Sequence, residues 1–235
     1  GVVSNELGMK GRPAVAEDIA VARDIFLAEA TGTPVHIAHI STKNAVDLVR
    51  QAKKRGVQVT AEVTPQHLIF TDEALRTFET RYKMNPPIRS DIHRDACVEG
   101  LKDGTIDAVV TDHAPHEWEE KDQEFNLAPS GFVGLETSVG AMLTHLYHTG
   151  IIDLMSLVNV MSTAQAKILN LDAGVIAPGK DADLTFLDLD KEWTVDSSKF
   201  YSKGKSTPFD EMIFKGKAAA TIVNGKFVMK NGEVL

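Results

Sequence analysis

The chain has 235 residues, of which 43% are hydrophobic and 25% are charged, and its formal net charge is -8 at pH 7. This composition is typical of a globular protein with a sizeable core, and no apolar run is long enough to cross a bilayer. The acidic balance, with scattered Lys and Arg, argues against nucleic-acid binding and against binding to an anionic membrane surface. A single cysteine, Cys97, excludes an internal disulfide and fits a reducing compartment, so we expect a cytoplasmic protein.

The first half of the chain alternates between helical and extended patterns. A helix is predicted over residues 14–30, with Pro13 before it and Gly32 just beyond its end. Ser41 or Thr42 can cap a second helix, which runs to about Arg55. The other predictions are a helix over residues 91–102, strands over residues 35–40, 57–63, 81–85 and 106–110, a loop over residues 1–11, and mixed helix and loop over residues 68–80. This alternation is typical of parallel βα units.

The second half of the chain changes character twice. Helices are predicted over residues 135–149, 154–161 and 163–169. From Gly174 onward short strands and turns replace them, with a strand over residues 184–187. Asn224-Gly225 lies between two extended segments and favours a hairpin turn. These patterns predict a small all-β subdomain beside the βα units.

Polar, titratable side chains follow the apolar stretch of residues 106–110. Asp112, His113 and His116 come directly after it. The carboxyl ends of buried parallel strands are where α/β folds keep their active-site residues. Asp112 could therefore ligate a metal or transfer a proton, or it could simply cap the next segment.

Two other predicted strands end in similar groups. His39 ends one of them, and Asn85 ends another just before Pro86-Pro87. If these strands are parallel neighbours, both side chains converge with Asp112 and His116. His and Asp are suitable zinc ligands, but two ligands fall short of the three or four that zinc sites use. Asn85 could instead cap the Pro-Pro turn.

The remaining histidines carry weaker signals. Strand alternation makes His36 an outward-facing, structural residue. His67 follows a strand end and could be either functional or structural. The others lie on predicted helices, where we expect solvated side chains: His93, His145 and His148.

Five segments in order resemble class I dihydroorotases, which are members of the zinc amidohydrolase superfamily. They are VHIAHIST (35–42), AEVTPQHL (61–68), KMNPPIR (83–89), TDHAPH (111–116) and GFVGLET (131–137). Residues 174–183 are similar to the amidohydrolase signature that leads into a C-terminal β-sandwich. The resemblance covers essentially the whole chain, and five ordered motifs make it specific.

The resemblance implies a fold and an activity. The fold is α/β: a TIM-like (β/α)8 barrel of the metal-dependent hydrolase type with a small β-sandwich. Residues 1–172 would be the C-terminal portion of the barrel, and residues 173–235 the C-terminal part of the sandwich. The activity is the reversible cyclisation of N-carbamoyl-L-aspartate to L-dihydroorotate in pyrimidine biosynthesis, with zinc as cofactor.

Four residues match functional positions of these motifs. The resemblance makes His39 a zinc ligand, and it makes Asp112 both a zinc ligand and the group that shuttles the proton. It also makes Asn85 and His116 contacts of the substrate.

The family further offers backbone to the substrate at Ser130 and Gly131, within a Pro-Phe-Gly motif. This sequence has Pro129-Ser130-Gly131, so the side-chain role of the family's Phe is lost while a backbone contact can survive. The charged residues 117–128 would form a mobile loop near the site.

Other parts of the family's site are expected upstream of Gly1. These are a His-x-His pair, an arginine and an asparagine for the substrate carboxylate, a bridging aspartate and another histidine. The chain has no initiator Met and begins in mid-pattern, so we expect a truncated chain that is not active alone.

Three alternatives stay open. Allantoinase and dihydropyrimidinase share the barrel but usually differ from dihydroorotase at the positions of Asn85 and His116. A non-catalytic dihydroorotase-like partner of aspartate carbamoyltransferase is the third, although such proteins tend to lose the ligands that His39 and Asp112 represent. For the enzyme, the expected partners are its small-molecule substrate, a second copy in a homodimer, and aspartate carbamoyltransferase.

Overall fold

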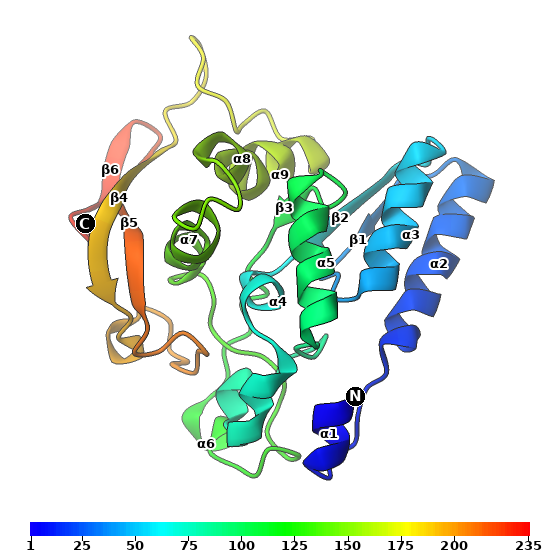
Figure 1. Ribbon diagram of the computed structural model, residues 1–235. Helices are drawn as coiled ribbons and strands as arrows, with labels where there is room; N and C mark the ends of the chain where they lie inside the picture. The colour runs from blue at the N-terminus through cyan, green and yellow to red at the C-terminus, as the bar shows by residue number, and fades with distance from the viewer. The chain divides into compact units, whose positions relative to one another are not determined.

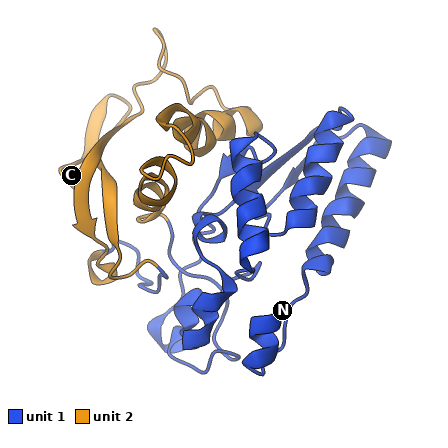
Figure 2. Cartoon of the chain, viewed as in Figure 1, with its two compact units in different colours: residues 1–134, 200–208 blue, residues 135–199, 209–235 orange.

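The computed structural model describes residues 1–235 and has an α/β architecture. The chain forms two compact units. The first contains residues 1–134 and 200–208, and the second contains residues 135–199 and 209–235 (Figure 2). No helix is both long and apolar enough to span a membrane.

The first unit is built on a three-stranded parallel sheet with the order β1-β2-β3. The strands are β1 (Val35–Ile37), β2 (Val59–Val63) and β3 (Ala108–Val109). Val35 pairs with Val59, and Glu62 pairs with Ala108. Parallel pairing between strands separated by helices confirms the predicted βα units.

Three helices cover one face of this sheet. They are α2 (Ala14–Thr31), α3 (Lys43–Lys54) and α5 (Asp91–Lys102), which lie side by side (Figure 1). Of the two predicted caps, Thr42 is the one that caps α3, by accepting a hydrogen bond from the backbone N–H of Ala45. Along β2 the buried Val59, Ala61 and Val63 alternate with half-buried Thr60 and Glu62, so the second face of the sheet carries polar side chains.

Short elements complete the first unit, and two expectations are corrected there. The unit also contains α1 (Val2–Glu6), α4 (Pro65–Ile69), η1 (Asp72–Thr77), η2 (Thr80–Tyr82) and α6 (Trp118–Lys121). Residues 1–11 are therefore not only loop, because α1 lies among them. The strand predicted over residues 81–85 was wrong: the segment forms η2 and then runs into Pro86-Pro87, whose nitrogens have no hydrogen to donate to a ladder.

The second unit begins with helices, as predicted. Turns of π-helix interrupt them, labelled η3 and η4. The elements are α7 (Ser138–Met142), η3 (Leu143–Tyr147), α8 (Leu154–Val158), η4 (Asn159–Thr163) and α9 (Ala164–Ile168).

A four-stranded antiparallel sheet follows, with the order β4-β5-β6-β7. Its strands are β4 (Leu184–Thr194), β5 (Ile213–Val223), β6 (Lys226–Lys230) and β7 (Glu233–Val234), and η5 (Ser197–Lys199) lies between β4 and β5. Asn224 and Gly225 both have positive φ, at 49° and 75°, which confirms the predicted hairpin turn. The strand predicted over residues 184–187 was too short, because a register shift between Asp188 and Glu192 hides the alternation of the rest of β4.

The helices and the sheet of the second unit meet at a small residue. A Cβ on Gly140 would lie 2.6 Å from the ring of Phe214 and 2.9 Å from that of Trp193. Those two rings pack edge to face with their centroids 5.5 Å apart. Glycine at this position lets α7 approach β5 closely. The predicted boundary between barrel and sandwich at residue 172 stays a prediction.

Candidate functional site

Three titratable side chains meet at the carboxyl ends of β1, β2 and β3. His39 Nε2 lies 3.4 Å from Asp112 Oδ1, and His39 Nδ1 lies 2.9 Å from Glu62 Oε1. The three side chains are between 14% and 28% exposed, so a small ligand can reach them. Parallel strands in the order β1-β2-β3 bring their last residues to one edge of the sheet, which explains the convergence.

The backbone at two of these residues is unusual. His39 has φ 51° and Asp112 has φ 48°, values in the left-handed region that side chains other than glycine rarely adopt. Both residues lie just past a strand, where this conformation breaks the alternation of the strand. Asp112 does not cap a helix, since the next helix, α6, begins at Trp118 with Glu117 as its N-cap.

The side chains of this cluster shift one another's pKa values. The hydrogen bond to Asp112 is the largest cause that raises the pKa of His39 to about 9, and the hydrogen bond to Glu62 is the next largest. Burial alone would raise the pKa of Glu62, but contacts with His36 and His39 lower it to about 2. One imidazole is thus held between two carboxylates.

Glu62 is a member of the cluster that the sequence interpretation missed. Its Oε2 lies 3.0 Å from His36 Nε2, and the other ring nitrogen of His36 lies 2.8 Å from Thr60 Oγ1. The predicted structural role of His36 therefore includes holding Glu62 beside His39. The alternation of Thr60 and Glu62 with apolar residues was the available signal, because it places Glu62 on the polar face of the sheet.

His67 does not join this cluster. It is 3% exposed, its Nε2 lies 3.1 Å from the carbonyl oxygen of Pro86, and its Nδ1 lies 2.9 Å from Thr64 Oγ1. Burial lowers the pKa of His67 to about 4, so the ring is neutral, donates from Nε2 to Pro86 and accepts from Thr64. His67 thus fixes the segment that follows Asn85.

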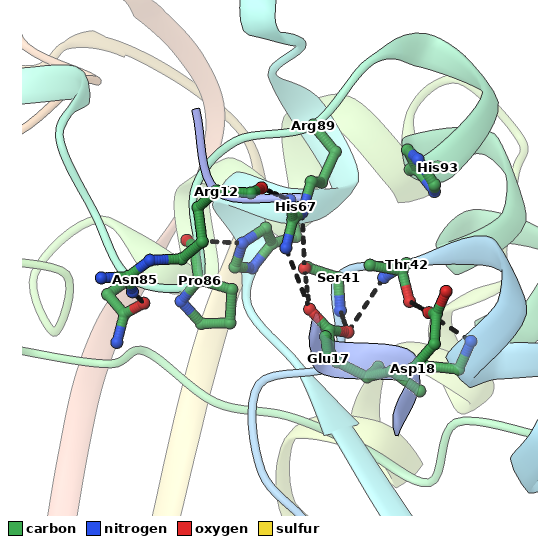
Figure 3. Close-up of polar contacts among 12 residues, drawn as sticks. Arg12, Glu17, Asp18, Ser41, Thr42, His67, Asn85, Pro86, Arg89 and His93 are labelled. Atoms are coloured by element: carbon green, nitrogen blue, oxygen red, sulfur yellow. Dashed lines mark hydrogen bonds and ion pairs between the residues drawn. The ribbon is translucent and has the colours of Figure 1, made fainter. Parts of the chain in front are cut away.

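Asn85 is oriented by a neighbouring guanidinium. Its Oδ1 accepts a hydrogen bond from Arg12 Nη1, which leaves the amide nitrogen to face a ligand (Figure 3). The backbone carbonyl of Arg12 accepts a 2.6 Å hydrogen bond from Arg89 Nη1. No hydrogen bond joins Asn85 to His39 or Asp112, and the hydrogen-bond partner of its side chain is Arg12 instead.

Arg89 and Glu17 connect this segment to the loop after His39. Glu17 Oε1 accepts hydrogen bonds from the backbone nitrogens of Ser41 and Thr42, at 2.7 and 3.1 Å (Figure 3). Glu17 also pairs with Arg89 at 3.5 Å, and Arg89 Nε donates to Ser41 Oγ. Both charged side chains are nearly buried, at 14% and 10% exposure. Sequence analysis gave no sign of this network, because its members are far apart in the chain.

The histidines predicted to be solvated do have partners. His93 Nδ1 accepts a hydrogen bond from the backbone N–H of Lys43 at the start of α3. His145 packs edge to face against Phe214, and His148 Nε2 lies 2.8 Å from the carbonyl oxygen of Leu189. The expectation of solvated side chains was wrong for His93 and His145, which are partly buried, whereas His148 is exposed as expected.

His116, Ser130 and Gly131 form a second group. His116 Nε2 lies 3.0 Å from the carbonyl oxygen of Ser130, and its Nδ1 lies 3.2 Å from Glu120 Oε2. Gly131 has φ 125°, and a Cβ there would lie 2.8 Å from Ala114 Cβ and 3.1 Å from His116 Nε2. Glycine is therefore required where this backbone passes His116.

A cavity of about 800 Å³ lies in the first unit beside these groups. Arg12, Lys83, Arg89 and Ser130 are part of its lining, whereas His39 and Asp112 are not. The cavity therefore reaches the segments around Asn85 and Ser130 from one side. Its size suits a small organic molecule.

The central pair fits a zinc ion as part of its ligand set. Two ligands roughly 2.1 Å from one tetrahedral zinc ion are roughly 3.4 Å apart, which matches the distance between His39 Nε2 and Asp112 Oδ1. Glu62 beside the other ring nitrogen supplies the outer carboxylate that metal-bound histidines usually have. No group of three or more His, Cys, Asp or Glu that could hold a metal is present in residues 1–235, so this pair supplies two ligands and not a complete site.

Comparisons with known proteins agree with the resemblance seen in the sequence. The chain is 52% identical over 231 residues to the dihydroorotase of Pelotomaculum thermopropionicum, and 53% identical over 228 residues to that of Citrifermentans bemidjiense. These matches cover 98% and 97% of the chain but 54% of each relative. The chain therefore spans about half the length of the curated relatives it matches.

Solved structures share the fold. L-hydantoinase (dihydropyrimidinase) from Arthrobacter aurescens matches 95% of the chain and 51% of its own, with a TM-score of 0.91 and 35% identity. The dihydropyrimidinase from Brevibacillus agri NCHU1002 matches 95% and 50%, with a TM-score of 0.90 and 27% identity. The family model described as "Amidohydrolase family" matches residues 7–228, and the chain belongs to this family.

Proposed function

We propose that this chain carries part of the active site of a zinc-dependent dihydroorotase, which interconverts N-carbamoyl-L-aspartate and L-dihydroorotate in pyrimidine biosynthesis. The observation that carries the proposal is the 3.4 Å approach of His39 to Asp112 at the ends of neighbouring strands. Both residues lie in segments that resemble dihydroorotase motifs, within a chain about half identical to proteins of that name. His39 and Asp112 are the proposed zinc ligands of this chain, and the remaining ligands of the proposed site would come from other parts of the protein that carries it.

Asp112 is the proposed general acid and base. A bound zinc ion would supply Lewis acidity toward water and toward the ring carbonyl. In hydrolysis Asp112 accepts a proton from the attacking water as its oxygen adds to the carbonyl carbon. Asp112 then donates this proton to the ring nitrogen as the C–N bond breaks. Ring closure is the same sequence reversed.

Other residues of the chain would bind the substrate. The amide nitrogen of Asn85 can donate to a ring carbonyl, because Arg12 already occupies Oδ1. His116 and the backbone of Ser130 and Gly131 form the second contact. The N–H of Ser130 makes no hydrogen bond within the chain and is therefore an available donor.

The wider architecture is proposed from the family. Residues 1–172 would belong to a TIM-like barrel and residues 173–235 to a β-sandwich that would include the sheet β4–β7. The protein would act in the cytoplasm as a homodimer, with aspartate carbamoyltransferase as a further partner.

A related cyclic amidohydrolase is the second candidate. The structural matches to dihydropyrimidinase and to hydantoinases support it. Those names denote enzymes of neutral rings, whereas dihydroorotate carries a carboxylate. Turnover of dihydroorotate, dihydrouracil, hydantoin and allantoin by the protein that carries this chain separates the candidates, and preference for dihydroorotate is expected.

The first prediction concerns Asp112. Asp112→Asn should lower kcat by several orders of magnitude in both directions, because an amide cannot carry the proton. Asp24→Asn on α2 is the matched control: this half-buried carboxylate pairs only with Arg23, so the variant should keep normal rates. Rates of hydrolysis and of ring closure provide the measurement. Near-normal turnover by Asp112→Asn would contradict the proposed proton transfer.

A further inference from the structure

Lys121 is a buried lysine in the first unit that the proposed chemistry does not use. It is the last residue of α6, and it is only 3% exposed. Its Nζ donates to the carbonyl oxygens of Pro129, at 3.0 Å, and Gly131, at 2.9 Å. Lys121 pairs with no carboxylate, so these neutral oxygens are the acceptors that hold the charge. A buried ammonium group is stable only when hydrogen-bond acceptors surround it, so the fold depends on these two contacts.

These bonds fix the conformation of residues 129–131. The carbonyls of Pro129 and Gly131 turn toward Lys121, while the carbonyl between them, that of Ser130, turns toward His116 Nε2. The N–H of Gly131 donates to the carbonyl oxygen of Lys83 at 2.9 Å. The N–H of Ser130 is then the one backbone donor of this pair without a partner in the chain.

The position of Lys121 is itself fixed. Thr80 Oγ1 donates a 2.6 Å hydrogen bond to the backbone carbonyl of Lys121. Glu120, one residue earlier in α6, faces His116 Nδ1 at 3.2 Å. Lys83 Nζ donates to the carbonyl oxygens of Phe125 and Asn126 in the loop that joins α6 to Pro129. The segment around α6 therefore holds both His116 and the Ser130–Gly131 backbone.

We propose that Lys121 is a positioning residue, which holds the Ser130–Gly131 backbone in the conformation that binds the substrate. The inference rests on the proposed function, since it assigns the support of one of its binding contacts. Lys121 lies within residues 117–128, the charged segment expected to lie near the site, and it supplies the cation that holds the Ser130–Gly131 backbone.

The test is the kinetics of Lys121→Met in the protein that carries this chain. Loss of charge-assisted hydrogen bonds should raise KM for dihydroorotate by roughly 10- to 100-fold. kcat and bound zinc should change by less than threefold, because Asp112 and His39 are untouched. Lys121→Arg keeps a cation with several hydrogen-bond donors, so its KM should lie between the values of the wild type and of Lys121→Met. The exposed Lys102→Met on α5 should leave KM unchanged.

Two further measurements keep the proposal falsifiable. If Lys121→Met does not fold, Thr80→Val removes only the bond that fixes the Lys121 carbonyl, and a KM raised several-fold at normal kcat is expected. Hydrogen exchange at the Gly131 amide should accelerate in the same variants, and it does not depend on activity.

An inactive wild type would contradict the proposed function but not the role of Lys121. A folded Lys121→Met with normal KM and normal exchange at Gly131 would overturn the role of Lys121.

Discussion

His67 shows at the scale of one residue how burial decides the role of a histidine. Its strand-end position left a functional and a structural role open, and the structure gives it the structural one. Both ring nitrogens are used inside the protein, one by Pro86 and one by Thr64. A neutral ring that orders the segment beside Asn85 supports the site without taking part in chemistry.

The neutral state of His67 predicts a pH dependence of stability. Its pKa is about 4 in the folded protein and 6.5 in the unfolded chain. Between these values the unfolded chain binds the extra proton, so the free energy of unfolding decreases as the pH falls from 6.5 to 4, by at most about 1.4 kcal/mol per pH unit. The free energy of unfolding can be measured by urea denaturation at several pH values in this range. It should change less with pH for His67→Gln than for the wild type. An equal pH dependence in the two proteins would show that His67 does not contribute.

The residues that sequence analysis identified share one property. His39 and Asp112 directly follow apolar strands, where a periodic pattern ends in a polar group, and this position can be read locally. Glu62 and Lys121 could not be found in the same way. Glu62 lies within a strand, and Lys121 lies in a charged segment that reads as a solvated loop. Their roles become visible only in the structure, where Glu62 contacts His39 and Lys121 donates a hydrogen bond to Gly131.

At the scale of elements, the pair of Glu17 and Arg89 joins α2 to the start of α3 and to the segment before α5. The carboxylate of Glu17 also accepts two backbone hydrogen bonds at the residues just before α3. Removing one partner would leave the other charged group nearly buried and unpaired. The arrangement of three elements thus depends on two side chains.

We predict that Arg89→Met lowers the free energy of unfolding by about 2 kcal/mol. Arg23→Met is the matched control, because Arg23 pairs with Asp24 on the surface and is 66% exposed. The control should cost less than about 0.5 kcal/mol. Urea denaturation of the two variants provides the comparison. An equal decrease in the free energy of unfolding for the two variants would show that the nearly buried pair stabilises the fold no more than the surface pair does.

Elements with a clear period were predicted from sequence, and irregular ones were not. The helices α2, α3 and α5 and the Asn224-Gly225 hairpin carry strong local signals and were found. The strand at residues 81–85 was wrong because Pro86-Pro87 cannot donate to a ladder. β4 was cut short because its register shift removes the alternation on which the prediction relied.

At the scale of the whole molecule, the structure groups residues that the sequence separates. Residues 200–208 belong to the first unit although they follow β4 of the second. Their contacts include the hydrogen bond from the Val133 N–H to the Ser206 carbonyl oxygen, at 2.9 Å. No local pattern predicts a contact across about seventy residues, so the return of the chain could not be foreseen.

Metal binding is the property to test on the whole chain. His39 and Asp112 are two ligands, and tight zinc sites use three or four. We predict that residues 1–235 produced alone do not retain stoichiometric zinc after dialysis. Metal analysis by atomic absorption measures this, with His39→Ala as the comparison. Stoichiometric zinc that disappears in His39→Ala would contradict the prediction.

The left-handed backbone at His39 and Asp112 has a consequence for protein engineering. Each residue stores roughly 1 kcal/mol of strain that glycine would relieve. A library selected for thermostability alone would therefore drift toward glycine at these two positions and discard the histidine and the carboxylate together. Screens for a more stable variant therefore need to measure activity in every round, because at these two positions thermal stability favours glycine and the proposed activity requires histidine and aspartate.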